Sequence, residues 1–301
     1  MNHTHKITIA DHKDLERHRL ITKFLRIFVI PVLNRIPAST LQKVIKKSSH
    51  YGSSVIKKAG TTHSLEAMYT KHQKPPFYKG ILNALADSFW HNIISQPKAI
   101  RNRLKLVERA MEGEIVKKIV ENKEKGKTTN KISILSVGGG SCRALMHTID
   151  RLKKGGLEFE VNVVNVDKDV TAIELGKEIA EGFGLLNSFR WINDDARNIG
   201  SIIEKESMDI VEMVGLLDYF SDDRAREIFK SIHNILKRDG LFIVANVYPN
   251  SEMPFVENVG WPKMYYRDEE RFINILEGIG FSDLNVILEP LKVHVLALLR
   301  K

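Results

Sequence analysis

The stretch ISILSVGGGSCRAL, residues 132–145, joins a run of β-branched and apolar residues to three consecutive glycines and then to a helical pattern. The apolar run predicts a buried strand over 132–137, and the pattern after the glycines predicts a helix. Glycine can turn tightly and approach a ligand closely because it has no Cβ. The free N–H groups and positive dipole end of a helix N-terminus also favour a ligand there. This unit therefore predicts an α/β sheet with a ligand site at Gly138, Gly139 and Gly140, although such a turn can also be purely structural.

The same alternation of strands and helices continues to the C-terminus. Further strands are expected at 160–166, 188–192, 208–214, 241–247, 284–289 and 293–300, and helices at 142–154, 170–182, 222–237 and 268–279. Helix-length connections separate the first five strands, which requires parallel pairing. Only Pro290, Leu291 and Lys292 separate the last two strands, which predicts an antiparallel hairpin at the sheet edge. We expect a Rossmann-like, seven-stranded, mostly parallel sheet that binds ligands at the carboxyl ends of its strands.

The N-terminal part of the chain carries the whole excess of positive charge. The 301 residues have a net charge of +9, of which residues 1–80 carry +11 and the remainder −2. A polar, glycine-containing stretch at 123–131 marks a boundary. We therefore expect a basic helical N-terminal region over 1–125 and a ligand-binding domain over 131–301. The N-terminal region is expected to cap the ligand cleft.

A basic segment attached to a nearly neutral body indicates an anionic partner. The apolar stretch around Phe24, Phe28 and Ile30, with lysines and arginines nearby, is typical of a helix at a membrane interface. The same charge could contact RNA phosphates, but aromatic residues are not interleaved with the basic ones as base stacking requires. A simple solvated basic face is the remaining interpretation. Peripheral contact with an anionic membrane is thus expected more than contact with nucleic acid.

The composition excludes several other classes of protein. Hydrophobic residues make up 43% of the chain, which is enough for a packed core. One cysteine excludes a disulfide framework and a thiolate-rich metal site. The eleven histidines show no metal-ligand spacing, so no metal is expected. No apolar run approaches 18 residues and no signal peptide is evident, so we expect a cytoplasmic protein that can also bind the membrane periphery.

Two acidic positions follow the next two strands. Asp167 ends the strand expected at 160–166, where a carboxylate can accept hydrogen bonds from both hydroxyls of a ribose. Alternatively, Asp167 or Asp169 caps the helix that follows. After the next strand, a side-chain oxygen of Asp195 could accept from an adenine amino group while a backbone N–H near Ala196 meets a ring nitrogen. A solvated acidic turn is the alternative there.

With these features in order, residues 132–300 resemble the class I S-adenosylmethionine-dependent methyltransferases. Gly138–Gly140 correspond to the first motif of that family, Asp167 to its ribose acid, and Asp195 with Ala196 to its adenine contact. The segment DIVEMVGLLDYF (209–220) is similar to the fourth-strand motif, and the final hairpin to the reversed seventh strand. The resemblance implies S-adenosylmethionine as the cofactor, held by Gly138, Gly139, Gly140, Asp167, Lys168, Asp195, Ala196 and Gly215.

Two positions depart from the usual form of the family. The acid commonly found two residues before the first glycine is Ser136 here, and the third glycine position is Cys142. The contact that this acid makes near the methionine part of the cofactor must therefore be made differently or be lost. The segments GLLDYF (215–220), ANVYPNSE (245–252) and GWPKMYYRDEE (260–270) resemble a little-characterised bacterial subgroup, some of whose members are associated with methylating fatty-acid-derived or other small molecules.

The predicted activity is methyl transfer to a small, anionic or amphipathic acceptor through a carboxylate or hydroxyl. Methyl transfer is an in-line displacement that depends on proximity and orientation, and a carboxylate acceptor needs no strong base. Arg267 could clamp an anionic acceptor, and Tyr219 or Tyr266 could orient it or close over the sulfonium. Alternatively, Tyr265 and Tyr266 pack a loop while Arg267 pairs with Asp268 or Glu269.

Two other classes of protein remain open on this sequence. A nucleotide-dependent oxidoreductase could use the same glycine turn for a pyrophosphate. It is disfavoured because Arg143 stands at the third glycine of G-x-G-x-x-G and the acid lies 29 residues after Gly138, rather than about 20. A non-catalytic cofactor-sensing or membrane-binding module could keep the same fold, and Ser136 and Cys142 keep that interpretation open. The sequence does not predict an oligomeric state.

Overall fold

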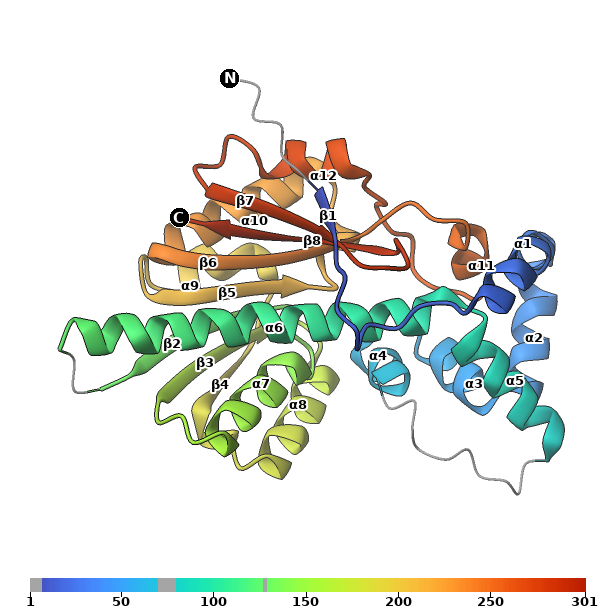
Figure 1. Cartoon of the computed structure of the whole chain (residues 1–301), viewed down its shortest axis with the longest axis horizontal. Coiled ribbons are helices and arrows are strands. Elements are labelled where there is room, and N and C mark those ends of the chain that lie inside the picture. The colour runs from blue at the N-terminus through green and yellow to red at the C-terminus, as the bar shows by residue number, and fades with distance from the viewer. Residues whose placement is uncertain (1–6, 70–79, 127–128) are drawn as a thin grey trace.

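The computed structural model describes residues 7–69, 80–126 and 129–301, and it contains an eight-stranded sheet in the order β1-β7-β8-β6-β5-β2-β3-β4 (Figure 1). The strands are β1 (Ile7–Ile9), β2 (Lys131–Val137), β3 (Glu160–Asp167), β4 (Phe189–Asn193), β5 (Met208–Val214), β6 (Leu236–Val247), β7 (Ser282–Leu288) and β8 (His294–Arg300). The N-terminal helices are α1 (Leu20–Arg35), α2 (Ala38–Ser48), α3 (His50–Lys57), α4 (Thr62–Tyr69), α5 (Ile81–Asn92) and α6 (Ser95–Glu124). The later helices are α7 (Arg143–Lys154), α8 (Val170–Gly182), α9 (Ile199–Ile202), α10 (Asp222–Ile235), α11 (Met253–Asn258) and α12 (Glu269–Leu276).

The predicted Rossmann-like sheet with its C-terminal hairpin is confirmed, with one addition. Strands β2 to β6 pair in parallel, and β8 pairs antiparallel with both β6 and β7. The sequence did not predict β1, which pairs in parallel with β7 and takes the sheet edge expected for the hairpin. Three residues are too few to show a strand periodicity, so only the contact with β7 defines this strand.

Helices cover both faces of the sheet because its strands are apolar on both faces. In β2, Ile132 and Ile134 belong to the cluster that packs against α6 and α7, whereas Leu135 and Val137 belong to the cluster on the side of α10 and α12. Neighbouring side chains of a strand point to opposite faces, so these residues serve two separate cores. The carboxyl ends of the parallel strands are left for a site.

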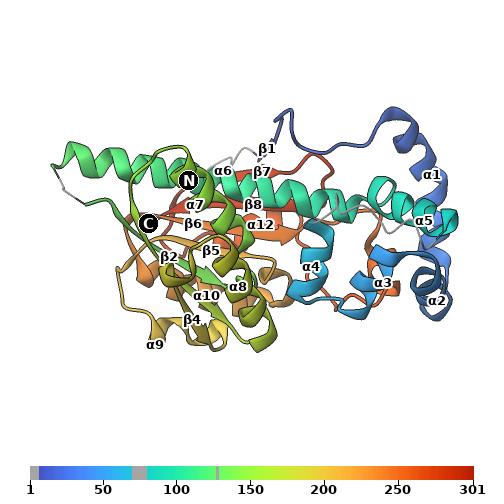
Figure 2. The same ribbon diagram turned by 90° about the horizontal axis from the view of Figure 1, so that it is seen from below.

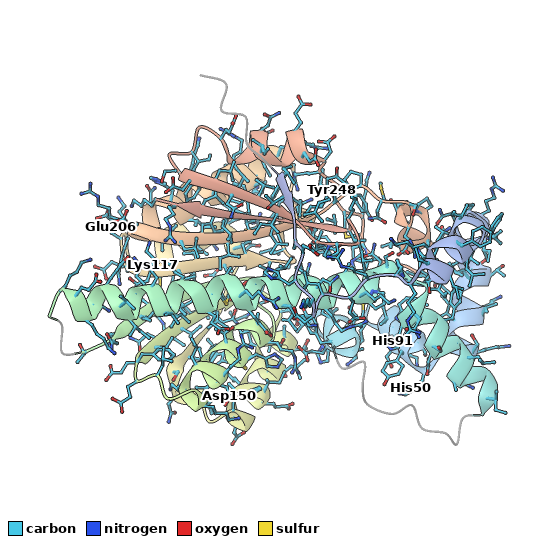
Figure 3. All side chains as sticks on the ribbon, in the orientation of Figure 1. His50, His91, Lys117, Asp150, Glu206 and Tyr248 are labelled. Atoms are coloured by element: carbon cyan, nitrogen blue, oxygen red, sulfur yellow. The ribbon has the colours of Figure 1, made fainter. Side chains whose placement is uncertain are left out.

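Helix α6 extends from the sheet into the helical end of the molecule (Figures 1 and 2). Its residues Val107, Met111, Ile115 and Ile119 are buried in the core of the sheet. Figure 3 shows Lys117 on the part of α6 that lies over the sheet, and His91 just before the helix begins in the helical end. The stretch 123–131 therefore marks a change of sequence texture, while the helix before it belongs to the core of the sheet.

Helices α1, α2, α3 and α5 gather at one end of the molecule together with α11, and α4 lies between them and the sheet (Figure 1). We call α1 to α5 the helical cap. It has its own apolar core, in which Val55, Met68 and Trp90 pack with Phe255 and Val256 of α11. A buried carboxylate ties the cap to the rest of the fold: Glu252 accepts from the backbone N–H groups of Ser95 and Gln96, at 2.8 and 3.3 Å, and pairs with Arg26 of α1.

Candidate active site

A cavity of about 510 Å³ lies where the carboxyl ends of the strands meet the helical cap. From the sheet, its lining includes Gly138, Gly139, Gly140, Asp167, Lys168, Asp195, Ala196 and Gly215. All eight residues that the sequence assigns to the cofactor are thus brought to one cavity. The cap and the first turns of α6 supply the opposite wall, with Val55, Leu65, Met68 and Trp90 from the cap and Ile100 and Arg103 from α6.

The turn after β2 requires glycine for two separate reasons. Gly138 has a φ of +62°, and a Cβ on it would lie 2.5 Å from the Leu216 side chain. A Cβ on Gly139 would lie 1.8 Å from the Ser136 hydroxyl and 2.9 Å from Asn165 Oδ1. Neither position can carry a side chain without moving its neighbours. The turn therefore keeps its backbone open to the cavity.

Asp167 points its carboxylate at this turn and does not cap the next helix. Its Oδ2 accepts from the Gly140 N–H and its Oδ1 from the Asp169 N–H, both at 2.9 Å. The residue that caps this helix is Asp169, which accepts from the Thr171 N–H at 2.9 Å. Each oxygen of Asp167 keeps a further lone pair for a hydroxyl donor, and burial raises the pKa of the group. The position suits a ribose.

Asp195 lies at the same edge but already has a partner. Its carboxylate accepts from the Arg197 backbone N–H at 2.9 Å and from the Arg197 Nε at 2.8 Å, and this contact lowers the pKa of Asp195. Ala196 beside it is buried. The acidic turn is therefore held in place by Arg197. Asp195 and Ala196 line the part of the cavity that follows β4.

A carboxylate from the neighbouring strand lies beside Ser136, the position at which the family usually has an acid. The register of β2 and β5 places Ser136 opposite Glu212, and the Ser136 hydroxyl donates to Glu212 Oε1. Glu212 is buried and lines the cavity. A carboxylate thus reaches the base of the glycine turn from the neighbouring strand, where it suits a cofactor amino group. The sequence signal was present, since Glu212 is an acid inside the apolar strand MDIVEMV (208–214).

Glu212 should make the stability of the protein fall as the pH rises. Burial raises the pKa of Glu212 to about 7 from its ordinary value of 4.5, so the folded protein holds this proton more tightly than the unfolded chain. The resulting stabilisation is complete below the unfolded pKa and is lost between about pH 4.5 and 7. Glu212→Gln lacks this ionisation, so its decline in urea midpoint between pH 5 and pH 8 should be smaller than that of the wild type. An equal decline of the urea midpoint in the wild type and in Glu212→Gln would contradict a raised pKa for Glu212.

Several polar groups gather at the ends of β5 and β6 and the start of β8. Asp218 is buried and accepts from the Val247 N–H at 2.7 Å. His294 is buried beside them, and neither ring nitrogen has a hydrogen-bond partner among the described residues. Burial and the nearby charge of Arg103 lower the pKa of His294 well below its usual value, so the ring is neutral at pH 7.

Arg103 of α6 lines the same cavity and faces this group. It is 3% exposed, and its Nε has no hydrogen-bond partner among the described residues. Its guanidinium lies against Gly215, on which a Cβ would be 3.4 Å from Arg103 Nη2. Within residues 7–69, 80–126 and 129–301, no carboxylate lies within 4.0 Å of it as an ion-pair partner. Arg103 was not among the residues that the sequence assigned to a ligand.

The three predicted substrate-positioning residues have different outcomes. Tyr219 lines the cavity, its Oη accepts from the Trp261 Nε1–H at 3.0 Å, and burial raises its pKa to about 12. Tyr266 is half-buried and does not line the cavity. The prediction for Arg267 as a clamp is wrong, because its side chain is fully buried outside the cavity and donates to Asp222, at 2.9 Å, and to neighbouring acceptors. The alternative partners, Asp268 and Glu269, are also not the ones found.

The helical cap is fastened to the glycine turn. Glu66 of α4 accepts from the Ser141 hydroxyl at 2.6 Å and from the Arg143 Nε at 2.7 Å. A Cβ on Gly140 would lie 2.3 Å from the Thr62 hydroxyl oxygen, so α4 packs directly on the turn. Cys142, in the left-handed conformation at φ +51°, is buried, and burial raises the pKa of its thiol. It therefore acts as a small residue at the helix start and not as a nucleophile.

The fold and this site are those of a class I methyltransferase domain, and a comparison with known families agrees for part of the chain. Residues 134–240 match a family model described as a methyltransferase domain. The matched segment includes Gly138–Gly140, Asp167 and Asp195, and it supports methyl transfer from S-adenosylmethionine as the reaction. No curated protein sequence matches the chain.

Two solved structures show the same fold over most of the chain. A protein from Bordetella parapertussis, described as a possible exported protein, has a TM-score of 0.62 at 18% identity and covers 81% of this chain and 80% of its own. An O-methyltransferase family protein from Burkholderia thailandensis has a TM-score of 0.51 at 13% identity and covers 80% of this chain and 60% of its own. At these identities the similarity concerns the fold alone.

Proposed function

We propose that the acceptor of this methyltransferase is a small amphipathic carboxylic acid whose carboxylate is bound by Arg103. The observation that carries the proposal is a buried guanidinium that has no ion-pair partner among the described residues and that lines a cavity with a largely apolar wall on the side of the cap and α11. Isolated buried charges are strongly unfavourable, so such a group calls for an anionic ligand. Arginine also matches the two oxygens of a carboxylate.

The order of the strands supports placing the acceptor near Arg103. Seven of the eight predicted cofactor contacts follow β2, β3 and β4, which lie together at one end of the sheet, and the eighth, Gly215, follows β5. Arg103 faces Gly215 at the end of β5, and β6 and β8 continue the sheet on the side away from β3. A cofactor stretched towards Asp167 and Asp195 therefore leaves the β5–β6–β8 half for the acceptor.

The walls of that half suit an apolar body attached to the carboxylate. The lining there is supplied by the side chains of Trp90, Ile100, Phe255, Val256, Val259, Trp261 and Met264. Burial of apolar ligand surface against such a wall contributes about 25 cal/mol per Å². A fatty or aromatic acid can pack its apolar body against this wall and place its carboxylate against Arg103.

Methylation of a carboxylate requires the protein to position the two reactants but not to supply a general base. When bound, S-adenosylmethionine supplies a methyl group that carries the electrophilic character of its sulfonium. A carboxylate oxygen forms the new bond to carbon as the carbon–sulfur bond breaks, and no proton has to leave. Arg103 would hold the attacking oxygen in line while the cap excludes water, so that proximity and orientation provide most of the rate.

The test uses matched ligands on protein loaded with S-adenosylhomocysteine. Decanoate and cinnamate should bind in calorimetry, and decanamide and cinnamamide, which have the same shape without the charge, should bind at least tenfold more weakly. Arg103→Gln should lose at least tenfold in affinity for the acids, because it loses charge-assisted hydrogen bonds. With S-adenosylmethionine and an accepted acid, mass spectrometry should detect the methyl ester.

The cofactor has a carboxylate of its own, so the experiment must show whether Arg103 binds that carboxylate or the carboxylate of the acceptor. S-adenosylhomocysteine should bind Arg103→Gln within threefold of the wild type. If its affinity falls sharply while that of 5′-methylthioadenosine, which lacks the amino-acid part, is unchanged, Arg103 holds the cofactor and the proposal is wrong. Equal binding of acids and amides would contradict it as well.

A further inference from the structure

The outer face of α1 exposes a continuous row of large apolar side chains. Six of them are more than half exposed: Leu20, Ile21, Phe24, Ile27, Phe28 and Val32. We call these six residues the α1 face. The opposite side of the helix packs against the protein, and Ile30 there is 3% exposed. Single exposed apolar residues are ordinary, but a contiguous patch of this kind marks a surface that contacts something else.

The chain around this face is strongly positive. Residues 17–65 contain ten lysines and arginines and no aspartate or glutamate. Six of the cations are exposed on or beside α1 and α2: Arg19, Lys23, Arg35, Lys43, Lys46 and Lys47. Within the part of the chain that the structure describes, none of these six forms an ion pair. A row of apolar side chains flanked by cations without ion-pair partners is complementary to a surface with an apolar interior and negatively charged groups at its boundary.

The geometry of α1 favours lying on a membrane over crossing it. No single described helix is long and apolar enough to span a bilayer, and α1 with α2 satisfies that test only as a pair bent by 118°. The 16 residues of α1 extend about 24 Å, which is shorter than a hydrocarbon core of about 30 Å. Arg26 on its inner side pairs with the buried Glu252 and so holds the helix against the protein.

From these observations we propose that the α1 face, with its flanking cations, docks the enzyme on an anionic lipid bilayer. The apolar side chains enter the boundary between head groups and acyl chains while the lysines and arginines contact lipid head groups. Phe24 and Phe28, whose ring centroids are 5.3 Å apart, form the aromatic centre of this surface.

The docked helix lies close to the cavity. Helix α1 packs on α11, and Phe255, Val256 and Val259, in α11 and just after it, line the cavity. Glu252 connects α1 to the start of α6, which carries Arg103 further along. Docking would place the cavity one helix away from the lipid, where an amphipathic acceptor is concentrated. The docking itself does not depend on which acceptor the enzyme uses.

The experiment is co-sedimentation of the full chain with vesicles. Wild-type protein should bind phosphatidylcholine vesicles containing 30% phosphatidylserine, and at least fivefold less of it should bind to pure phosphatidylcholine or in 500 mM NaCl. The double variant Phe24→Ser/Phe28→Ser should bind at least tenfold more weakly. Val116→Ser/Val120→Ser removes two exposed apolar side chains from α6 at the other end of the molecule and should bind as the wild type does.

A second pair of variants separates charge from apolar contact. Lys43→Gln/Lys46→Gln/Lys47→Gln should lose most of the binding to anionic vesicles, whereas Lys177→Gln/Lys205→Gln/Lys230→Gln, with exposed lysines elsewhere, should keep it. Equal binding to neutral and anionic vesicles, or to neither, would overturn the proposal. So would light scattering that shows a dimer converted to a monomer by Phe24→Ser/Phe28→Ser, or tighter binding to a single-stranded RNA than to vesicles.

Discussion

Replacing Asp167 by alanine should lower the affinity for S-adenosylhomocysteine at least 100-fold. The carboxylate is fixed towards the cavity by two backbone N–H groups, so it is already placed to accept from both hydroxyls of the ribose. Hydrogen bonds to a charged group contribute about 1.5–3 kcal/mol each, and the variant loses two of them. Calorimetric titration of the purified variant measures the loss directly.

The neighbouring Asp169 provides the matched control. It caps α8 through the Thr171 N–H, so Asp169→Ala should cost about 1 kcal/mol of stability while cofactor affinity stays within threefold of the wild type. If the two alanine variants bind S-adenosylhomocysteine equally well, Asp167 does not hold the ribose. The same titration with NADH tests the oxidoreductase alternative, since binding of NADH alone would contradict a methyltransferase site.

The cofactor half of the site could be predicted because its signals are local. Each predicted contact follows a strand at once, and the carboxyl ends of parallel strands meet at one edge. Because Gly138, Asp167 and Asp195 lie at or just after the ends of their strands in the sequence, their location at this edge of the sheet could be predicted. Glycine was also required by geometry, as the contacts around Gly139 show.

The acceptor half could not be predicted in the same way because distant segments form it. Arg103 reaches Gly215 only because α6 crosses the sheet, and both Gly215 and His294, which its charge affects, lie more than 100 residues later in the chain. Glu212 lies beside Ser136 only through the β2–β5 register, which brings residues 76 positions apart into contact. Pairings of this kind depend on tertiary packing, and no local pattern encodes them.

Arg267 shows how a local interpretation can fail. Its charge and its loop position suggested an anion clamp, yet its Nη1 donates to Asn246 Oδ1 at 2.7 Å and its Nε to Asp222 Oδ1 at 2.9 Å. Further N–H groups are directed at the backbone carbonyls of Leu217 and Phe220. The side chain therefore joins the loop after β5, which carries Asp218 and Tyr219, to the end of β6.

Replacing Arg267 by methionine should consequently destabilise the fold by about 3 kcal/mol and leave cofactor affinity within threefold of the wild type. Methionine fills much of the volume, but the buried acceptors lose their donors and Asp222 loses one of its two cations. Arg271→Met removes the other, half-exposed cation of the same carboxylate and should cost less than 1 kcal/mol. Urea unfolding measures both. A variant Arg267→Met as stable as Arg271→Met, but unable to methylate a carboxylic acid, would return Arg267 to the substrate and remove Arg103 from its proposed role.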